Sequence, residues 1–179
     1  MGIDISALSH LEYVEPEQHP DYDDDECQED NHWQPCDDGA FPSHHRDLKS
    51  GCYSETTATE YLGFCSSATY HLWWRDQLSL CVIGVPFLSI VKDPLVYLCS
   101  PFIELICFTD TYGTIGPAVC GKLAREFAEH EESARKHANE VIALNPDFGA
   151  AVAKEWFDRY QEFKQAFILG AQGGLVQFS

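Results

Sequence analysis

The stretch FGAAVAKEWFDRYQEFKQAFIL, residues 148–169, decides the fold class of this chain. Its large apolar side chains recur every three or four residues: Val152, Trp156, Tyr160, Phe163 and Phe167. That spacing puts them on one stripe of an α-helix, which a soluble protein must bury against another element. Gly173-Gly174 follows and ends the helix. The sequence therefore predicts a long amphipathic helix at the C-terminal end.

A second long helix is predicted immediately before the first. Pro117 suits its first position, because the N–H that proline lacks has no partner there, and Asn145-Pro146 ends it. Between these limits the apolar residues again have helical spacing: Val119, Leu123, Phe127, Ala134, Ala138, Val141 and Ile142.

The remaining segments predict a small sheet. Alternation indicates a first strand over Ile3 to Leu8, extending toward Val14, and one or two strands within 51–64. Ser66-Ser67 offers an N-cap for a helix through Leu80, and further strands are predicted over Phe102–Phe108 and, as an edge strand, over Leu175–Phe178. The expected fold is a single α+β (mixed α/β) domain over residues 1–179. Its small sheet packs against two long C-terminal helices, with an acidic irregular insertion at about 15–50.

The acidic charge lies mainly in the N-terminal part. The chain carries a net charge of −18, and residues 1–47 hold 14 of its 29 carboxylates but one of its 11 basic residues, Arg46. Such a chain repels phosphate backbones, which argues against nonspecific nucleic-acid binding, and it attracts basic protein surfaces. The simplest interpretation of the acidic run Asp21 to Glu26 is a solvated loop that aids solubility.

A cytoplasmic location is expected. The most apolar stretch, Cys81 to Phe108, is interrupted by prolines and charges, so it holds no membrane-spanning window, and the N-terminus lacks a signal-peptide pattern. The eight cysteines are accordingly predicted to be reduced, with four in apolar surroundings, Cys81, Cys99, Cys107 and Cys120. Possible metal ligands gather at Cys27, His32, Cys36, His44, His45 and Cys52, but without paired ligand spacing, so no metal and no cofactor is predicted.

The first candidate site is the element from Phe102 to Lys122, predicted as strand, loop and helix. A helix N-terminus favours phosphate or carboxylate, and loop glycines let the backbone approach a ligand. The candidate ligand-binding residues here are Thr109, Asp110, Thr111, Tyr112, Gly113, Thr114, Gly116 and Lys122. The alternative is a tight turn in which Asp110 caps local backbone amides.

The second candidate site lies at the predicted helix start after Phe64. Aromatic side chains beside an arginine suit a stacked base with a nearby phosphate. Its residues are Ser66, Ser67, Tyr70, Trp74 and Arg75. The alternative is an aromatic stripe in the core, with Arg75 paired to a surface carboxylate.

Catalytic signatures are weak. The chain contains no G-x-S-x-G, H-E-x-x-H or zinc-deaminase motif, so no catalytic residue is assigned and an enzyme is the less favoured class. His71 and Asp110 are the residues to test for turnover.

Several motifs resemble a family of hypothetical proteins of phages, prophages and bacteria. They are the start Met1-Gly2-Ile3-Asp4-Ile5, Tyr70 with Trp74-Arg75, the segment Phe102 to Asp110 followed by Gly113-Thr114-Ile115-Gly116-Pro117 and Lys122-Leu123, and the ending Gly174-Leu175-Val176-Gln177-Phe178. The resemblance covers residues 1–8 and about 60–179. Tyr112 stands where the family has an acidic residue, and Ser67-Ala68 where it has Ser-Gly. The resemblance implies a phage context and no particular activity.

Three functions follow as hypotheses. The leading one is a binding protein that sequesters a nucleotide-derived immune signal, of the cyclic-oligonucleotide or ADP-ribose type, without turnover. The first alternative is an acidic inhibitor that binds a host protein, and the second is a nucleotide or phosphoester hydrolase. The sequence also leaves open whether the protein forms a homo-oligomer, because its aromatic side chains suit a subunit interface as well as a core.

Overall fold

The computed structural model describes residues 2–15, 32–35, 44–108 and 112–179. Its centre is a four-stranded antiparallel sheet of order β5-β1-β7-β6. The strands are β1 (Gly2–Leu8), β5 (Tyr61–Ser67), β6 (Gly113–Ile115) and β7 (Leu175–Phe178). A smaller three-stranded sheet, of order β2-β4-β3, consists of β2 (Glu12–Tyr13), β3 (His32–Trp33) and β4 (Tyr53–Ser54).

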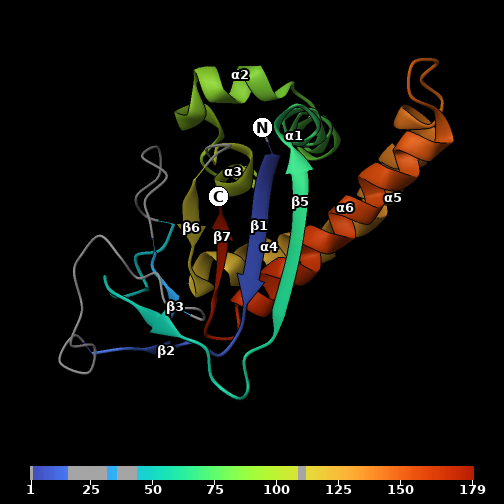
Figure 1. Cartoon of the computed structure of the whole chain (residues 1–179). Coiled ribbons are helices and arrows are strands. Elements are labelled where there is room, and N and C mark those ends of the chain that lie inside the picture. Colours follow the sequence, from blue (N-terminus) through green and yellow to red (C-terminus); the bar gives the residue numbers. More distant parts are fainter. Residues whose placement is uncertain (1, 16–31, 36–43, 109–111) are drawn as a thin grey trace.

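Helices cover one face and one end of the main sheet (Figure 1). Two of them, α4 (Pro117–Glu129) and α6 (Gly149–Gly170), cross behind the strands, while α1 (Ala68–Val82), α2 (Phe87–Lys92) and α3 (Ile103–Ile106) gather at the end where β1 begins. The remaining helical segments are η2 (Pro94–Tyr97), α5 (Glu131–His137) and the π-helix η3 (Ala138–Ile142). The predicted single-domain α+β class is confirmed.

The core lies where α1, α4 and α6 meet the sheet. The predicted stripe of α6 is buried, with Trp156, Tyr160, Phe163 and Phe167 at 0% exposure. Trp74 of α1 and Trp156 each donate the indole N–H to the other's backbone carbonyl oxygen, at 3.1 and 3.2 Å. Because a buried indole N–H needs an acceptor, this exchange satisfies both rings and fixes α1 on α6.

The predicted strand over Phe102–Phe108 is wrong, because this segment contains the one-turn helix α3. A short apolar run fits a buried strand or a buried helical turn equally well. Phe102 has a left-handed backbone (φ 60°), and its N–H donates to the Glu126 carboxylate at 2.8 Å. This contact with α4 starts the turn before Ile103.

Two other predicted elements are corrected. The helix predicted from Pro117 to Asn145 is divided at His130 into α4 and α5, followed by η3. His130 packs on Phe102, with ring centroids 5.7 Å apart, and the next residue, Glu131, binds Lys164 of α6 at 2.6 Å. β7 is an interior strand rather than an edge strand, because the segment predicted as a loop contains β6, which pairs with it.

Cysteine chemistry also differs from the prediction. Cys52, beside β4, is disulfide-bonded, whereas Cys65, Cys81, Cys99, Cys107 and Cys120 are free. Cys120 is buried as expected, but Cys99 is exposed. In the described part of the chain no helix is both long and apolar enough to cross a membrane.

Substitution of Gly174, which directly precedes β7, tests how closely the chain approaches the end of β1 at this point. A Cβ on Gly174 would lie 1.8 Å from the carbonyl oxygen of Leu8, whereas a Cβ on Gly173 would meet nothing within 4 Å and would be strained only by φ of 71°. We therefore expect Gly174→Ala to lower the free energy of unfolding by about 3 kcal/mol and Gly173→Ala by about 1 kcal/mol. Urea unfolding followed by circular dichroism measures both; equal losses would show that the backbone of Leu8 moves freely.

Candidate functional site

The start of α1 forms as the sequence predicts. The hydroxyl oxygen of the N-cap Ser67 accepts a hydrogen bond from the Tyr70 N–H at 3.2 Å. The helix then turns His71, Trp74 and Leu78 inward, while Tyr70 and Trp73 are half-buried at its outer side. Because residues three apart share a helix face, Tyr70 and Trp73 face the same space.

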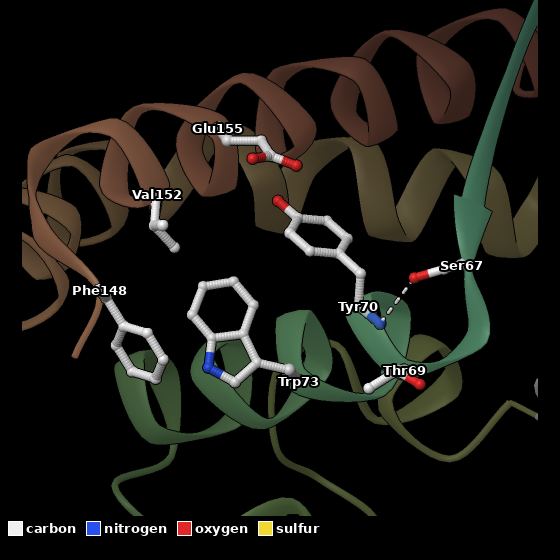
Figure 2. Close-up of a pocket in the computed structure, with 7 residues that line it drawn as sticks. All are labelled: Ser67, Thr69, Tyr70, Trp73, Phe148, Val152 and Glu155. Carbon is white, nitrogen blue, oxygen red and sulfur yellow. Dashed lines mark hydrogen bonds between the residues drawn. The ribbon is translucent and has the colours of Figure 1, made fainter.

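This space is a cavity of about 350 Å³ between α1 and the first turns of α6 (Figure 2). The residues that line it are Ser67, Thr69, Tyr70, Trp73, Phe148, Val152 and Glu155. The ring centroids of Tyr70 and Trp73 are 5.5 Å apart and those of Trp73 and Phe148 are 5.2 Å apart. Their planes are tilted by 48° and 59°, so the three rings form an angled aromatic wall against which a flat ligand can pack.

Unsatisfied polar atoms lie beside this wall. The Tyr70 hydroxyl and the Trp73 indole N–H are buried without a hydrogen-bond partner among the described residues. An unsatisfied buried group costs about 1–3 kcal/mol. Figure 2 shows the Tyr70 hydroxyl turned toward Glu155 of α6. Burial, and after it the Glu155 carboxylate, raises the pKa of Tyr70, so the phenol stays protonated and is available as a donor.

A second cavity adjoins the first across Trp73. Its volume is about 490 Å³, and Thr69 and Trp73 belong to both linings. The rest of its lining is mainly apolar: Leu72, Asp76, Pro86, Phe87 and Leu88. The Asp76 carboxylate accepts the Phe87 N–H at 2.9 Å and so holds the start of α2 against α1. Trp73 therefore separates a cavity lined by three aromatic rings and Glu155 from a larger, mainly apolar cavity whose lining includes Asp76.

Three residues that were predicted to bind ligand together with Tyr70 lie outside the cavity lining and make contacts within the fold. They are Ser66, Trp74 and Arg75. Trp74 is fully buried and hydrogen-bonded to α6. Arg75 is 1% exposed; its guanidinium donates to the carbonyl oxygens of Ile106 and Phe108 and lies 4.8 Å from the Phe87 ring centroid. Burial lowers the pKa of Arg75 to about 10, which leaves it charged at neutral pH. The buried Ser66 hydroxyl donates to the Ser67 carbonyl oxygen at 3.3 Å.

Arg75 lies away from the cavity. It faces the interior, where its guanidinium donates to backbone carbonyl groups around the end of α3. Of the residues predicted for this site, the structure brings Ser67 and Tyr70 to the cavity.

The other candidate element lies apart from this cavity. Thr109, Asp110 and Thr111 lie outside the described residues. Tyr112 is exposed, whereas Gly113 and Thr114 are buried in β6. Lys122 binds Glu104 at 2.6 Å and Glu126 at 3.2 Å. Burial alone would lower the pKa of Lys122, but these two carboxylates outweigh it and leave the pKa raised.

The N-terminus of α4, where an anion was predicted to bind, holds a carboxylate of the chain itself. The Ala118 N–H donates to Asp47, and the Gly116 N–H donates to the carbonyl oxygen of His44 at 2.8 Å. A side chain at Gly116 would not fit, since its Cβ would lie 2.3 Å from the Asp47 carboxylate. The glycine therefore serves the packing of the 44–47 turn on α4.

Three important lining residues were absent from the predicted site. They are Trp73, which directly precedes the predicted Trp74, and Phe148 and Glu155, which lie some 75 residues or more further along the chain. A helical wheel would have shown that Trp73 lies beside the stripe of Trp74 and Leu78 rather than on it. No local pattern indicates that α6 lies next to α1. Among the described residues no cluster of three or more potential metal ligands occurs.

Comparison of the chain with protein-family models, with curated proteins and with solved structures gives no match. The resemblance to the family of phage and bacterial proteins stays a prediction.

Substitution of Asp47 tests whether its carboxylate caps the backbone N–H groups at the N-terminus of α4. We expect Asp47→Ala to lower the free energy of unfolding by about 1 kcal/mol, because a helix start loses both an acceptor and a favourable charge. Asp47→Asn keeps an acceptor oxygen and should lose less. Thermal unfolding in chloride and in phosphate separates the two effects: phosphate should restore the alanine variant more than the wild type. A wild type and an alanine variant of equal stability would exclude the capping role.

His71 gives a test of pH dependence. Its ring packs against Trp74 and Phe163, and burial, followed by the charges of Arg75 and Arg159, lowers its pKa to about 3. Since the folded protein favours the neutral ring, its stabilising contribution is complete above about pH 6.5 and is lost as the pH falls toward 3. Between pH 7 and pH 4 the wild type should lose ~3 kcal/mol more of unfolding free energy than His71→Phe. Urea unfolding at both pH values measures this difference; parallel losses would mean that His71 takes up its proton in the folded state.

Proposed function

We propose that the protein binds a small molecule carrying a nucleobase-type ring in the cavity between α1 and α6, and that it holds this molecule without chemical turnover. The observation that carries the proposal is the wall of three rings, from Tyr70, Trp73 and Phe148, beside two buried and unsatisfied polar atoms. Every nucleobase has a π-face that stacks on aromatic side chains.

The hydrogen-bonding groups of the cavity match the edge of a base. A base edge offers N–H donors as well as carbonyl or ring-nitrogen acceptors. The Glu155 carboxylate accepts hydrogen bonds, while the Trp73 N–H and the Tyr70 O–H donate them. A simple ammonium ion would use Glu155 and leave the Trp73 donor unsatisfied, so the two orphaned atoms favour a base.

The charged groups at the cavity restrict which part of a nucleotide can enter it. Glu155 is the charged residue of its lining, and among the described residues it forms no ion pair. Arg75 and Lys122, the two cations predicted to hold a phosphate, bind carbonyl groups and carboxylates elsewhere. The proposal is therefore a nucleoside or base held inside. An ADP-ribose or cyclic oligonucleotide would keep its phosphates in solvent.

The lining residues also support binding without turnover. General acid–base catalysis is most effective when a group has a pKa near the working pH. Here the titratable lining groups are one exposed carboxylate and a tyrosine whose pKa is raised. The resemblance adds a phage context to this proposal, and we propose sequestration of a bacterial immune signal as the biological role in that context.

The test is isothermal titration calorimetry with adenosine, guanosine, cytidine, uridine, ADP-ribose and a cyclic dinucleotide. We expect at least one nucleoside to bind, and Trp73→Ala to weaken its binding ~10-fold or more, because loss of a stacking ring costs about 1–3 kcal/mol. Leu144→Ala is the matched control, since this exposed side chain lies outside the cavity lining. A panel that does not bind, or a Trp73→Ala variant with full affinity, would refute the assignment.

Two further measurements refine the proposal. Glu155→Gln removes the negative charge and should bring the affinity for ADP-ribose closer to that for adenosine, since the phosphates are then repelled less. Heat release of the bound ligand, followed by mass spectrometry, checks turnover. An intact ligand is expected, and a chemically altered one would make the protein an enzyme.

A further inference from the structure

The strand β5 has one open edge. In the sheet order β5-β1-β7-β6 it is an outer strand, and among the described residues it pairs with β1 and with no other strand. Its pairing with β1 is continuous over seven residues, from Tyr61 opposite Leu8 to Ser67 opposite Gly2. Figure 1 shows this edge turned away from β1 and β7, on the side from which α6 emerges.

The hydrogen bonds of β1 define which backbone groups of β5 face outward. Asp4 exchanges hydrogen bonds with Ser179, at 2.8 and 3.0 Å, so its N–H and C=O point away from β5. Its partner Cys65 is therefore in a pair without mutual hydrogen bonds, and its own backbone groups face the open edge. The Cys65 carbonyl oxygen confirms this, since it accepts from Arg159 of α6 at 2.9 Å.

The outward-facing backbone groups of the other β5 residues follow from the alternation of hydrogen bonding along the strand. In an antiparallel ladder every second residue directs its N–H and C=O to the same side. Tyr61, Gly63 and Ser67 therefore direct these groups outward together with Cys65, whereas Leu62, Phe64 and Ser66 bond to β1. The open edge offers a row of donors and acceptors with the spacing of a further strand.

The strand itself lacks the features that usually prevent strand addition, and the Arg159 side chain covers one of its outward groups, the Cys65 carbonyl oxygen. Proteins protect outer strands with lysines, prolines, bulges or very short length. The sequence Tyr61-Leu62-Gly63-Phe64-Cys65-Ser66-Ser67 contains no charged residue and no proline, and its register is unbroken. Tyr61, Gly63, Cys65 and Ser67 are exposed. An unprotected strand of this length is suited to binding an extended chain.

The charges around the edge identify the kind of chain. Asp4 lies on β1 opposite Cys65, and Glu60 immediately precedes the strand. On the α6 side, Arg159 lies 4.8 Å from the Phe64 ring centroid and is paired with Glu162 at 3.0 Å, and the neighbouring Asp158 is paired with Lys154. Carboxylates therefore outnumber cations beside the edge, and Arg159 is 16% exposed. A second copy of the chain, with a net charge of −18, would be repelled.

We propose that the outer edge of β5 binds an extended, lysine- or arginine-rich segment of a partner protein by β-strand addition. The N–H and C=O of Gly63 and the N–H of Cys65 provide the ladder hydrogen bonds, while the Cys65 carbonyl oxygen keeps its bond to Arg159, and the carboxylates on both sides select positive charge. This interaction is independent of the ligand cavity, whose lining contains neither Gly63 nor Cys65.

A matched pair of variants tests the ladder. Cys65→Pro removes an outward N–H without removing a bond to β1, because edge strands tolerate proline where the N–H faces outward. Cys65→Ala keeps the N–H. The probe is a fluorescein-labelled ten-residue peptide of alternating threonine and lysine, and its acidic counterpart has glutamate in place of lysine. Fluorescence anisotropy measures binding, and thermal unfolding verifies that both variants fold.

We expect the basic peptide to bind the wild type and Cys65→Ala equally, and Cys65→Pro at least tenfold more weakly, while the acidic peptide does not bind. In the wild type the bound peptide should also slow amide hydrogen exchange at Gly63 and Cys65, a measurement that needs no variant. Equal binding to the proline variant would reduce the contact to nonspecific charge attraction and overturn the proposal. It is overturned equally by absence of binding, or by a wild-type dimer in sedimentation that Cys65→Pro dissociates.

Discussion

The structure depends on the exchange of hydrogen bonds between Trp74 and Trp156. Each indole is fully buried, and a buried N–H without an acceptor would destabilise the fold. Each ring finds its acceptor on the backbone of the opposite helix, so neither α1 nor α6 can rotate or slide without breaking both bonds. Phe163 lies 4.7 Å from Trp74 between ring centroids and continues this contact toward the sheet. The cavity exists because this pair fixes the distance between two helices at which Trp73 and Phe148 meet.

Much of the fold could be predicted from the sequence because the responsible patterns are local. The α6 stripe, the Ser67 cap of α1 and the alternation in β1 each depend on residues within a few positions of one another. The errors arise where one local pattern is compatible with two kinds of secondary structure. The run Phe102–Phe108 fits strand and helical turn alike, and contact with Glu126 of α4 decides between them. β7 was predicted as an edge strand because Gly113–Ile115 is too short to be recognised as its partner.

The candidate site could be predicted less well, since its composition depends on contacts distant in sequence. A one-residue step around α1 separates Trp73, at the cavity, from Trp74, in the core, and the residue predicted from the sequence was Trp74. Asp47 lies some 70 residues before the helix that it caps, so a helix start that looked free for an anion already has one. Arg75 illustrates the same limit: its charge suggested an exposed phosphate contact, but the fold uses its donors to hold the carbonyl groups of Ile106 and Phe108.

The placement of the tryptophans has an optical consequence. Trp74 and Trp156 lie in the dry core, whereas Trp73 is half-buried at the cavity and Trp33 lies on the small sheet with its N–H donated to Glu55. The four indoles of the chain thus report on separate parts of the molecule. Emission from the buried pair shifts to longer wavelength when the helices separate, while an aromatic molecule stacked on Trp73 quenches that indole and leaves the core pair unchanged. The protein therefore carries separate intrinsic probes of its stability and of the occupancy of its cavity.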